Sequence, residues 1–444
     1  MLLAQVHVEA KLVVVLLQLS VIIVAARLFA ALFRKIGQPA VVGEIAAGLI
    51  LGPSVLGSPH FTWVHEYWSK LFHPTDPGLQ SLGDVFTMLS QLGLIFLLFL
   101  IGLEFDFKHL KTSRGSSLFI SIMGIIGPFG LGYGLAYLMF PHLGLEQKRF
   151  VGFALFMGTA MSITAIPILG RIMMELGITR SRIGAVTITA AAIDDACGWI
   201  LLATVSALVR SNFRIIDTLV MLAETLAFAA VMILVVRPLL VRWFAKALAK
   251  SEGFLTINSL AFLIIVMFLC AIATSIIGIF AIFGAFILGA TMSDQEQFRN
   301  AVAQRLRDFV TAFFLPIFFT YTGLRTDIGS VGGGTMWLFA FGVTAAAIIG
   351  KWGGCTLAAR LSGFSNRESC CIGVMMNTRA LMELIVINVG FELGVIPPSV
   401  FCMLVIMALV TTVMTAPLLL RLKQGTELEA YIDRSGFIAS PAMA

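Results

Sequence analysis

Two adjacent aspartates, Asp194 and Asp195, lie about midway along the apolar segment 181–209. That segment is long enough to cross a bilayer as a helix, so the pair is expected near the middle of the membrane. Ionisable residues at that depth are costly and usually serve a function. Because neighbouring residues on a helix point about 100° apart, the two carboxylates are expected to face different surroundings and to have different roles.

Three more charged side chains, Lys351, Arg379 and Glu383, lie in apolar segments closer to the C-terminus. Arg379 and Glu383 are four residues apart, a spacing that allows them to pair along one helix face. Burial disfavours the charged forms of carboxyl and amino groups, and a nearby opposite charge counters that effect. Such groups can exchange protons near neutral pH, as proton-coupled transport requires. A static ion-pair network that fixes helix packing is the alternative.

The segment 149–176 carries the hydroxyl residues Ser162 and Thr164 shortly before Pro167. A proline near hydroxyl residues in mid-span can interrupt a helix and free its carbonyl groups. Small monovalent cations prefer oxygen ligands, so Asp195, Ser162, Thr164 and freed carbonyls together predict a cation site. Alternatively, each hydroxyl bonds to the preceding helical turn, which is common in membrane helices.

The composition indicates a membrane protein. Of 444 residues, 59% are hydrophobic and 12% are charged, which is about half the charged share of a soluble domain. The mean hydropathy is +0.98. We therefore expect an all-α, polytopic membrane protein with about 13 transmembrane helices. The predicted spans are 10–33, 37–57, 81–105, 115–141, 149–176, 181–209, 214–241, 254–275, 277–293, 306–325, 334–361, 367–394 and 398–421.

Lys and Arg are distributed unevenly over the predicted loops. The odd-numbered loops and the C-terminal tail hold twenty of the 30, whereas the N-terminus and the even-numbered loops hold seven. By the positive-inside rule, the N-terminus is predicted outside and the C-terminus in the cytoplasm. Residues 424–444 are then a short cytoplasmic tail.

Two glycine patterns recur at an offset of seven predicted spans. Residues 43–48 in the second span match residues 284–289 in the ninth, and Gly102-Leu103 in the third matches Gly323-Leu324 in the tenth. An odd offset reverses the orientation, so spans 2–6 and 9–13 are predicted to form an inverted repeat with a site near the midplane. Symmetry then predicts a second broken helix in segment 367–394 that crosses the first.

Four longer motifs carry a family resemblance. They are GEIAAGLILGPSVLG at 43–57, FLIGLEFD at 99–106, AIDD at 192–195 and MNTRALMELI at 376–385. As a set they resemble the monovalent cation:proton antiporter-2 family, which holds NapA-like antiporters, Kef-type potassium efflux proteins and plant cation/H+ exchangers. The resemblance extends over nearly the whole chain.

This resemblance implies an NhaA-like antiporter fold with two crossed broken helices, and a homodimer that works by elevator-type alternating access. Residues 1–423 would form the transmembrane antiporter domain, with a mobile core at roughly 115–210 and 334–421 and dimerisation helices in the remainder. Asp195 matches the family's cation- and proton-binding aspartate. Asp194 matches the preceding aspartate of electrogenic members, and Lys351 looks like the lysine that pairs with it.

We therefore expect an antiporter, not an enzyme, that exchanges Na+ or Li+ for H+ electrogenically, with a bacterial plasma membrane as the default location. An electroneutral K+/H+ exchanger is the alternative, because the stretch 377–379 is closer to plant relatives, some of which move K+. A sodium-coupled organic-anion symporter is less favoured. An intramembrane aspartyl protease is disfavoured, because its two aspartates would come from different helices.

No cofactor is expected beyond the transported ions, with Asp195 as the Na+ ligand. The six cysteines show no CxxC or Cys/His spacing, so neither a disulfide framework nor a zinc site is expected. The nucleotide-binding domain of Kef systems is expected to be absent, since no G-x-G-x-x-G fingerprint occurs. Nucleic-acid binding is not expected either. Arg27 is expected to pack or to snorkel, and Glu44 to line an entrance or to pack.

Overall fold

The computed structural model describes residues 2–58, 68, 82–104, 115–178, 181–210, 215–379 and 381–435. Within these ranges every regular element is a helix and no strand occurs, which confirms the all-α prediction. The chain divides into two compact units. Unit 1 holds Met1–Ala25, Pro59–Phe107 and Ser206–Tyr321, and unit 2 holds Ala26–Ser58, Lys108–Val205 and Thr322–Ala444.

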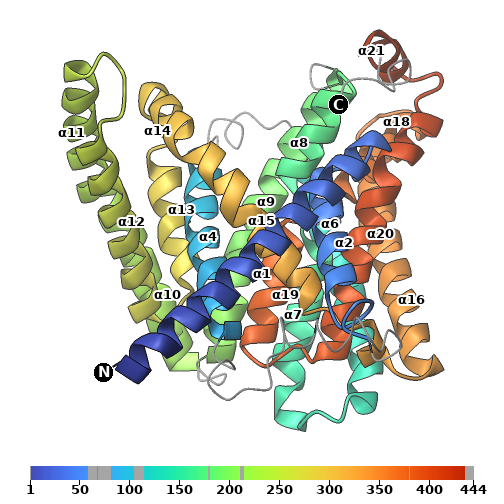
Figure 1. Ribbon diagram of the computed structural model, residues 1–444. Helices are drawn as coiled ribbons and strands as arrows, with labels where there is room; N and C mark the ends of the chain where they lie inside the picture. Colours follow the sequence, from blue (N-terminus) through green and yellow to red (C-terminus); the bar gives the residue numbers. More distant parts are fainter. Residues whose placement is uncertain are drawn as a thin grey trace. The chain divides into compact units, whose positions relative to one another are not determined.

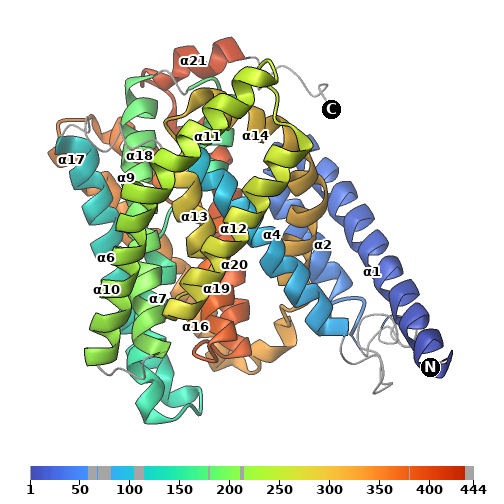
Figure 2. The same ribbon diagram turned by 90° about the vertical axis from the view of Figure 1, so that its left-hand side faces the viewer.

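Unit 1 contains the first part of α1 and a group of mostly apolar helices (Figures 1 and 2). In chain order these elements are α1 (Leu2–Lys35), α4 (Leu82–Glu104), α10 (Ile215–Val231), the π-helical turn η3 (Met232–Val236), α11 (Arg237–Lys250), α12 (Ile257–Ile277), α13 (Ala281–Thr291), α14 (Glu296–Phe309), the π-helical turn η4 (Val310–Phe314) and most of α15 (Leu315–Leu324). Helix α13 packs against both α4 and α12.

Unit 2 contains every charged residue that the sequence assigned to the site. Its elements are α2 (Ala40–Leu51), α6 (Gly115–Met139), the short turns η1 (Phe140–His142) and η2 (Gln147–Arg149), α7 (Phe150–Ser162), α8 (Ile166–Glu175), most of α9 (Arg182–Arg210), η5 (Ile328–Val331), α16 (Gly334–Ile348), the π-helical turn η6 (Ile349–Gly353), α17 (Gly354–Leu361), α18 (Asn366–Met376), α19 (Leu381–Glu392), α20 (Pro398–Leu422) and α21 (Leu428–Ser435). Helix α6 packs against α7, α16 and α17, and α20 packs against α16, α18 and α19.

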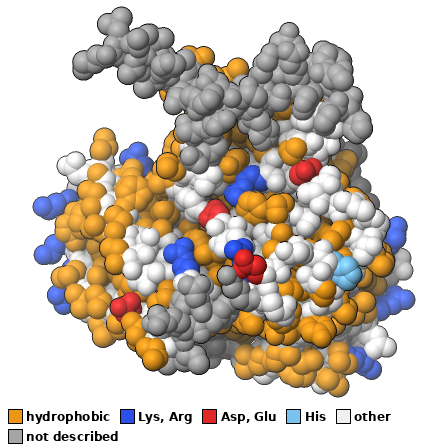
Figure 3. Space-filling view, turned by 90° about the horizontal axis from the view of Figure 1, so that it is seen from below, with side chains coloured by type: hydrophobic (Ala, Val, Ile, Leu, Met, Phe, Trp, Pro, Cys, Tyr) orange, Lys and Arg blue, Asp and Glu red, His pale blue; other side chains and the backbone are white. Residues whose placement is uncertain are grey.

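Eight helices in the described part of the chain are long and apolar enough to cross a membrane. Three shorter apolar helices, Ala40–Leu51, Phe150–Ser162 and Ala281–Thr291, add to them. Each of the 13 predicted segments coincides with one helix or with two helices in series, although the exact number of spans stays a prediction. On the face drawn in Figure 3, apolar side chains cover much of the surface that is not grey, and Lys, Arg, Asp and Glu side chains lie between them.

The glycine patterns of the sequence are sites of close helix packing, and the two copies match. A Cβ atom built on Gly102 of α4 would lie 2.4 Å from the carbonyl oxygen of Phe286 on α13. A Cβ atom built on Gly323 of α15 would lie 2.4 Å from the carbonyl oxygen of Ile45 on α2. Ile45 and Phe286 are equivalent in the predicted repeat. Helix α4 of the first copy thus packs on α13 of the second copy, and α15 of the second copy packs on α2 of the first copy at the equivalent position. This reciprocity supports the inverted repeat.

The C-terminal tail begins with a helix that packs within unit 2. Leu428 and Ile432 of α21 are fully buried. The Glu427 carboxylate accepts a hydrogen bond of 2.6 Å from the backbone N–H of Ile183, in the first turn of α9. A carboxylate at that position satisfies a free helical N–H group and complements the helix dipole. The tail is therefore attached directly to the helix that carries the paired aspartates.

Candidate functional site

The two predicted broken helices are present in unit 2, and their interrupted segments meet. Helix α7 ends at Ser162 and α8 begins at Ile166, so the chain is non-helical over residues 163–165. Helix α18 ends at Met376 and α19 begins at Leu381. In Figure 1, α7 and α19 lie toward one end of the unit, and α8 and α18 lie toward the other. The prediction of two crossed, discontinuous helices is thus confirmed.

The two interruptions are joined by backbone and side-chain hydrogen bonds. Ala165 N–H donates to the Thr378 carbonyl at 3.0 Å, and the Thr164 hydroxyl donates to the Met376 carbonyl at 2.8 Å. These bonds satisfy the carbonyl group of the last residue of α18 and a carbonyl group in the interruption that follows it. Pro167 is the second residue of α8, a position where its missing N–H costs nothing.

The C-terminal end of α7 is stabilised instead by two buried cations. Arg379, which is fully buried, donates to the carbonyls of Ala160 at 3.0 Å and of Met161 at 2.5 Å. The Lys351 ammonium donates to the carbonyl of Ser162. Cations at a helix C-terminus are favourable because the free carbonyls and the helix dipole concentrate negative charge there.

Lys351 also holds the first aspartate of the pair. Its Nζ lies 2.7 Å from Asp194 Oδ2, and both side chains are fully buried. Lys351 belongs to the π-helical turn η6, and such turns are frequent at functional sites because they redirect a side chain within a helix. Thr164 lies beside the same carboxylate. A buried salt bridge with these added contacts leaves Asp194 electrically compensated.

Asp195 has different surroundings. Its side chain is 2% exposed, and no described group donates a hydrogen bond to its Oδ1 atom. One turn further along α9, the Trp199 indole interacts with its carboxylate. Sequence reasoning missed Trp199, although the spacing of four residues after Asp195 is the signal that identifies it. The carboxylate is therefore placed to take a proton or a cation.

Arg379 and Glu383 come together as their spacing predicted, but loosely. Arg379 Nη1 lies 3.6 Å from Glu383 Oε1, which is beyond hydrogen-bond length. Among the described residues, neither Glu383 oxygen accepts a hydrogen bond. Both side chains are fully buried, so Glu383 is a second carboxyl group in this unit with free acceptor capacity.

The two hydroxyls expected to bind a cation already use their protons. Ser162 donates to the carbonyl of Thr159, as in the alternative that the sequence left open. Thr164 donates across to α18. Each oxygen keeps lone pairs that can accept a bond or coordinate an ion.

Glu44 is buried in α2, and Arg27 lies on α1. Both interact with other groups, and the structure assigns neither to the site.

The buried aspartate pair, its lysine and the crossed broken helices define a class of secondary transporter in which half-helix ends meet at a midplane ion site. Residues 21–421 match the family described as the transmembrane sodium/hydrogen exchanger. The chain belongs to this family. It is an integral membrane protein and a cation/proton antiporter.

Individual relatives agree with the family assignment. The chain is 39% identical over 419 residues to the Na+/H+ antiporter NhaS4 of Synechocystis, covering 93% of this chain and 97% of that one. It is 33% identical to K+/H+ antiporter 1 of Saccharomyces cerevisiae, covering 92% of this chain and 46% of the yeast protein. The solved structure of the sodium proton antiporter MjNhaP1 from Methanocaldococcus jannaschii is similar to this chain, with a TM-score of 0.63 at 16% sequence identity. The match covers 95% of this chain and 99% of MjNhaP1, and it supports the fold.

One expectation is corrected by the family match. That expectation was stated as an absence, that the chain is not an enzyme. What the match to sodium/hydrogen exchangers supports is a positive statement, that the chain is a transporter, in agreement with the predicted antiporter.

Proposed function

We propose that the protein exchanges Na+ or Li+ for H+, and that Asp195 binds the cation and the proton alternately. The observation that carries the proposal is the difference between the two aspartates. Asp194 is paired with Lys351 at 2.7 Å, whereas no Lys or Arg in the described part of the chain pairs with Asp195. The Oδ1 atom of each aspartate receives no hydrogen bond from a described group. Asp195 is thus the carboxylate of the pair that is available for a transported ion.

Competition between cation and proton follows from the chemistry of a carboxyl group. A protonated carboxyl is a poor cation ligand, so cation binding at Asp195 requires loss of its proton. The apparent cation affinity is then expected to rise with pH, by up to about tenfold per unit where one proton is displaced. Oxygens of Ser162, Thr164 and nearby carbonyls are the proposed additional ligands, because small hard cations select oxygen.

The direct test measures proton flux in proteoliposomes with Na+, Li+ and K+ added separately. Asp195→Asn is expected to abolish cation-dependent flux and to leave folding intact, because the amide keeps the shape of the carboxylate without its charge. Asp294→Asn is the matched control, since Asp294 is a partly exposed residue paired with Arg237. Wild-type flux in Asp195→Asn would reject the assignment.

The Asp194–Lys351 pair supports electrogenic exchange. If Lys351 gives up its proton when Asp194 is drawn toward the ion, two protons move for each Na+, and one net charge crosses the membrane per cycle. If Lys351 stays charged throughout, one proton per cation gives electroneutral exchange. Flux measured under an imposed membrane potential decides between them: a voltage-independent rate contradicts the electrogenic version.

K+/H+ exchange is the second candidate, supported by the similarity to a yeast protein named as a K+/H+ antiporter. The same flux assay separates the two, since a K+ exchanger responds to K+ at least as strongly as to Na+. A sodium-coupled organic-anion symporter would require anion uptake driven by Na+ and has less support.

The proposed mechanism is elevator-type alternating access in a homodimer. The grouping of 108–205 with 322–444 in unit 2 supports a mobile core built from residues 115–210 and 334–421. Residues 26–58 also group with unit 2, although they lie outside the proposed core. All helices outside the proposed core form the proposed dimerisation scaffold. We further propose a bacterial plasma membrane, with the N-terminus outside and the C-terminus in the cytoplasm. Cysteine accessibility from each side of the membrane tests the orientation.

A further inference from the structure

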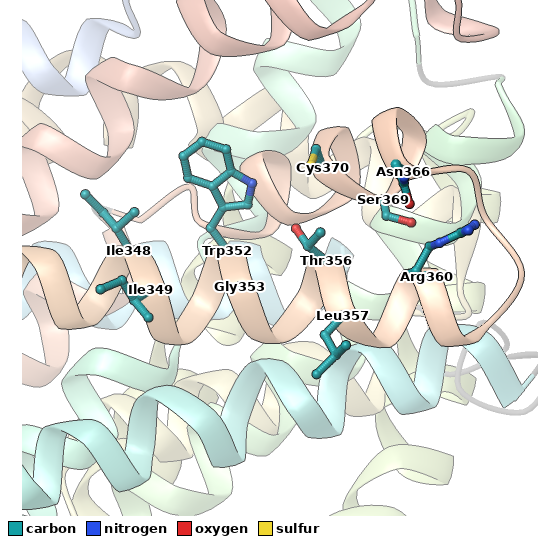
Figure 4. Close-up of a pocket in the computed structure, with 10 residues that line it drawn as sticks. All are labelled: Ile348, Ile349, Trp352, Gly353, Thr356, Leu357, Arg360, Asn366, Ser369 and Cys370. Atoms are coloured by element: carbon teal, nitrogen blue, oxygen red, sulfur yellow. The ribbon is translucent and has the colours of Figure 1, made fainter.

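A cavity of about 670 Å³ lies in unit 2 beside the transition from η6 to α17 and the start of α18. Figure 4 shows the side chains of Trp352 and Thr356 extending from one helix toward α18, and those of Asn366 and Ser369 coming from α18 itself. The volume is in the range of pockets that hold a drug-sized ligand. The lining residues are Ile348, Ile349, Trp352, Gly353, Thr356, Leu357, Arg360, Asn366, Ser369 and Cys370.

The two ends of this pocket differ in chemistry. Ile348, Ile349 and Trp352 line one end, and Arg360, Asn366 and Ser369 lie together at the other (Figure 4). Ile349 is 67% exposed, so the apolar end is open to the surroundings of the unit. The pocket therefore suits an amphiphile with an apolar chain and a polar head.

Two hydroxyl groups that line the pocket have no partner in the described part of the protein. Ser369 is fully buried, yet its Oγ makes no hydrogen bond, and neither does the buried Oγ1 of Thr356. A buried polar atom without a partner costs free energy that a ligand oxygen can recover. Ser369 lies at the polar end, where such an oxygen would also meet the Arg360 guanidinium.

Arg360 lies near the C-terminal end of a candidate membrane span. It lies in the last turn of the candidate span Gly334–Leu361, where a basic side chain reaches the level of lipid headgroups. One of its N–H groups donates to the Phe364 carbonyl at 2.9 Å, which fixes the guanidinium and leaves other donors available. The nearby Glu368 carboxylate accepts from the Ser365 N–H in a capping box, so it is already engaged.

We propose that this pocket binds an anionic phospholipid, with an acyl chain along Ile349 and Trp352 and the phosphate at Arg360 and Ser369. Arginine recognises phosphate through paired, charge-assisted hydrogen bonds. Basic pockets between transmembrane helices are suited to anionic headgroups for the same reason. The proposal is independent of the transported ion, so it stands or falls separately from the assignment of Asp195.

The test uses the full chain in detergent and measures its melting temperature with added phosphatidylglycerol, phosphatidylcholine or inorganic phosphate. Phosphatidylglycerol is expected to raise the melting temperature more than phosphatidylcholine, and phosphate alone is expected to have no effect. Arg360→Gln is expected to weaken the phosphatidylglycerol response by about tenfold in lipid concentration. Arg421→Gln is the matched control, because Arg421 is an exposed arginine in the last turn of α20 at the same end of the unit.

A second readout locates the acyl chain. Phosphatidylglycerol with brominated acyl chains is expected to quench Trp352, and Trp352→Phe and Arg360→Gln should each reduce the quenching at low lipid. The proposal is overturned if both headgroups stabilise equally, if Arg360→Gln and Arg421→Gln behave alike, or if inorganic phosphate reproduces the effect. The last result would indicate a soluble phosphate site instead.

Discussion

Replacing Lys351 with methionine tests whether the buried charges stabilise unit 2 as a pair. Methionine keeps most of the side-chain volume but removes the ammonium group, which contacts both Asp194 Oδ2 and the Ser162 carbonyl. Asp194 is then left fully buried without its counter-charge. Removing one partner of a buried ion pair costs about 3–5 kcal/mol, which corresponds to a fall in melting temperature of roughly 3–5 °C for a chain of this length.

A double-mutant cycle separates the ion pair from the other contact of Lys351. Asp194→Asn removes the unpaired charge, so Lys351→Met with Asp194→Asn is expected to be more stable than Lys351→Met alone. Lys423→Met is the control, since Lys423 pairs with the largely exposed Asp433 and such pairs contribute about 1 kcal/mol or less. The assay is the melting temperature of the purified protein, followed by size-exclusion chromatography of heated samples.

Additive losses in this cycle would refute the reasoning. If Asp194→Asn lowers the melting temperature by the same amount in the Lys351→Met background as in the wild type, Asp194 does not depend on Lys351, and the lysine acts only on the end of α7. A loss no larger than that of Lys423→Met would lead to the same conclusion.

Two further predictions concern packing and the tail. Gly323→Ala is expected to lower the melting temperature by the equivalent of about 1–3 kcal/mol, because its Cβ would meet the backbone of α2 at 2.4 Å. Gly342→Ala is the control and should have little effect, because its Cβ would meet only a side-chain atom at 3.9 Å. Equal effects of the two substitutions would contradict the packing argument. Glu427→Gln is expected to lower the free energy of unfolding by about 1 kcal/mol, because it weakens the cap of α9. The control is Glu429→Gln, since the Glu429 carboxylate accepts a hydrogen bond from Gly425 within the tail. An unchanged melting temperature of Glu427→Gln would show that the tail does not stabilise α9.

The sequence predicted the parts of the site that depend on hydrophobicity and charge. A charged residue within an apolar segment is visible without a structure, and this signal located Asp194, Asp195 and Lys351. The break in segment 367–394 was predicted from symmetry and from the polar stretch 377–379, because that stretch contains no glycine or proline. The inverted repeat thus supplied information that local composition lacked.

Other features depend on geometry that residue types do not encode. Arg379 was expected to pair with Glu383, but its hydrogen bonds go to two carbonyls of α7, a helix more than 200 residues earlier in the chain. The π-helical turn that presents Lys351 has no sequence signature in the apolar run around it. The docking of α21 depends on a hydrogen bond between Glu427 and Ile183, which follows from tertiary packing.

The two copies of the repeat share a fold but differ in charge. Both interrupted helices have carbonyl groups that need partners, yet α7 is capped by Lys351 and Arg379, whereas α18 accepts from the neutral groups of Thr164 and Ala165. Helix α9 carries the two aspartates, whereas α20, its counterpart in the repeat, carries threonines within its buried part. A symmetric backbone therefore holds an asymmetric set of charges. Both aspartates lie on α9, whereas α20 has no acidic group and the buried carboxyl group of the second copy, Glu383, lies on α19 instead.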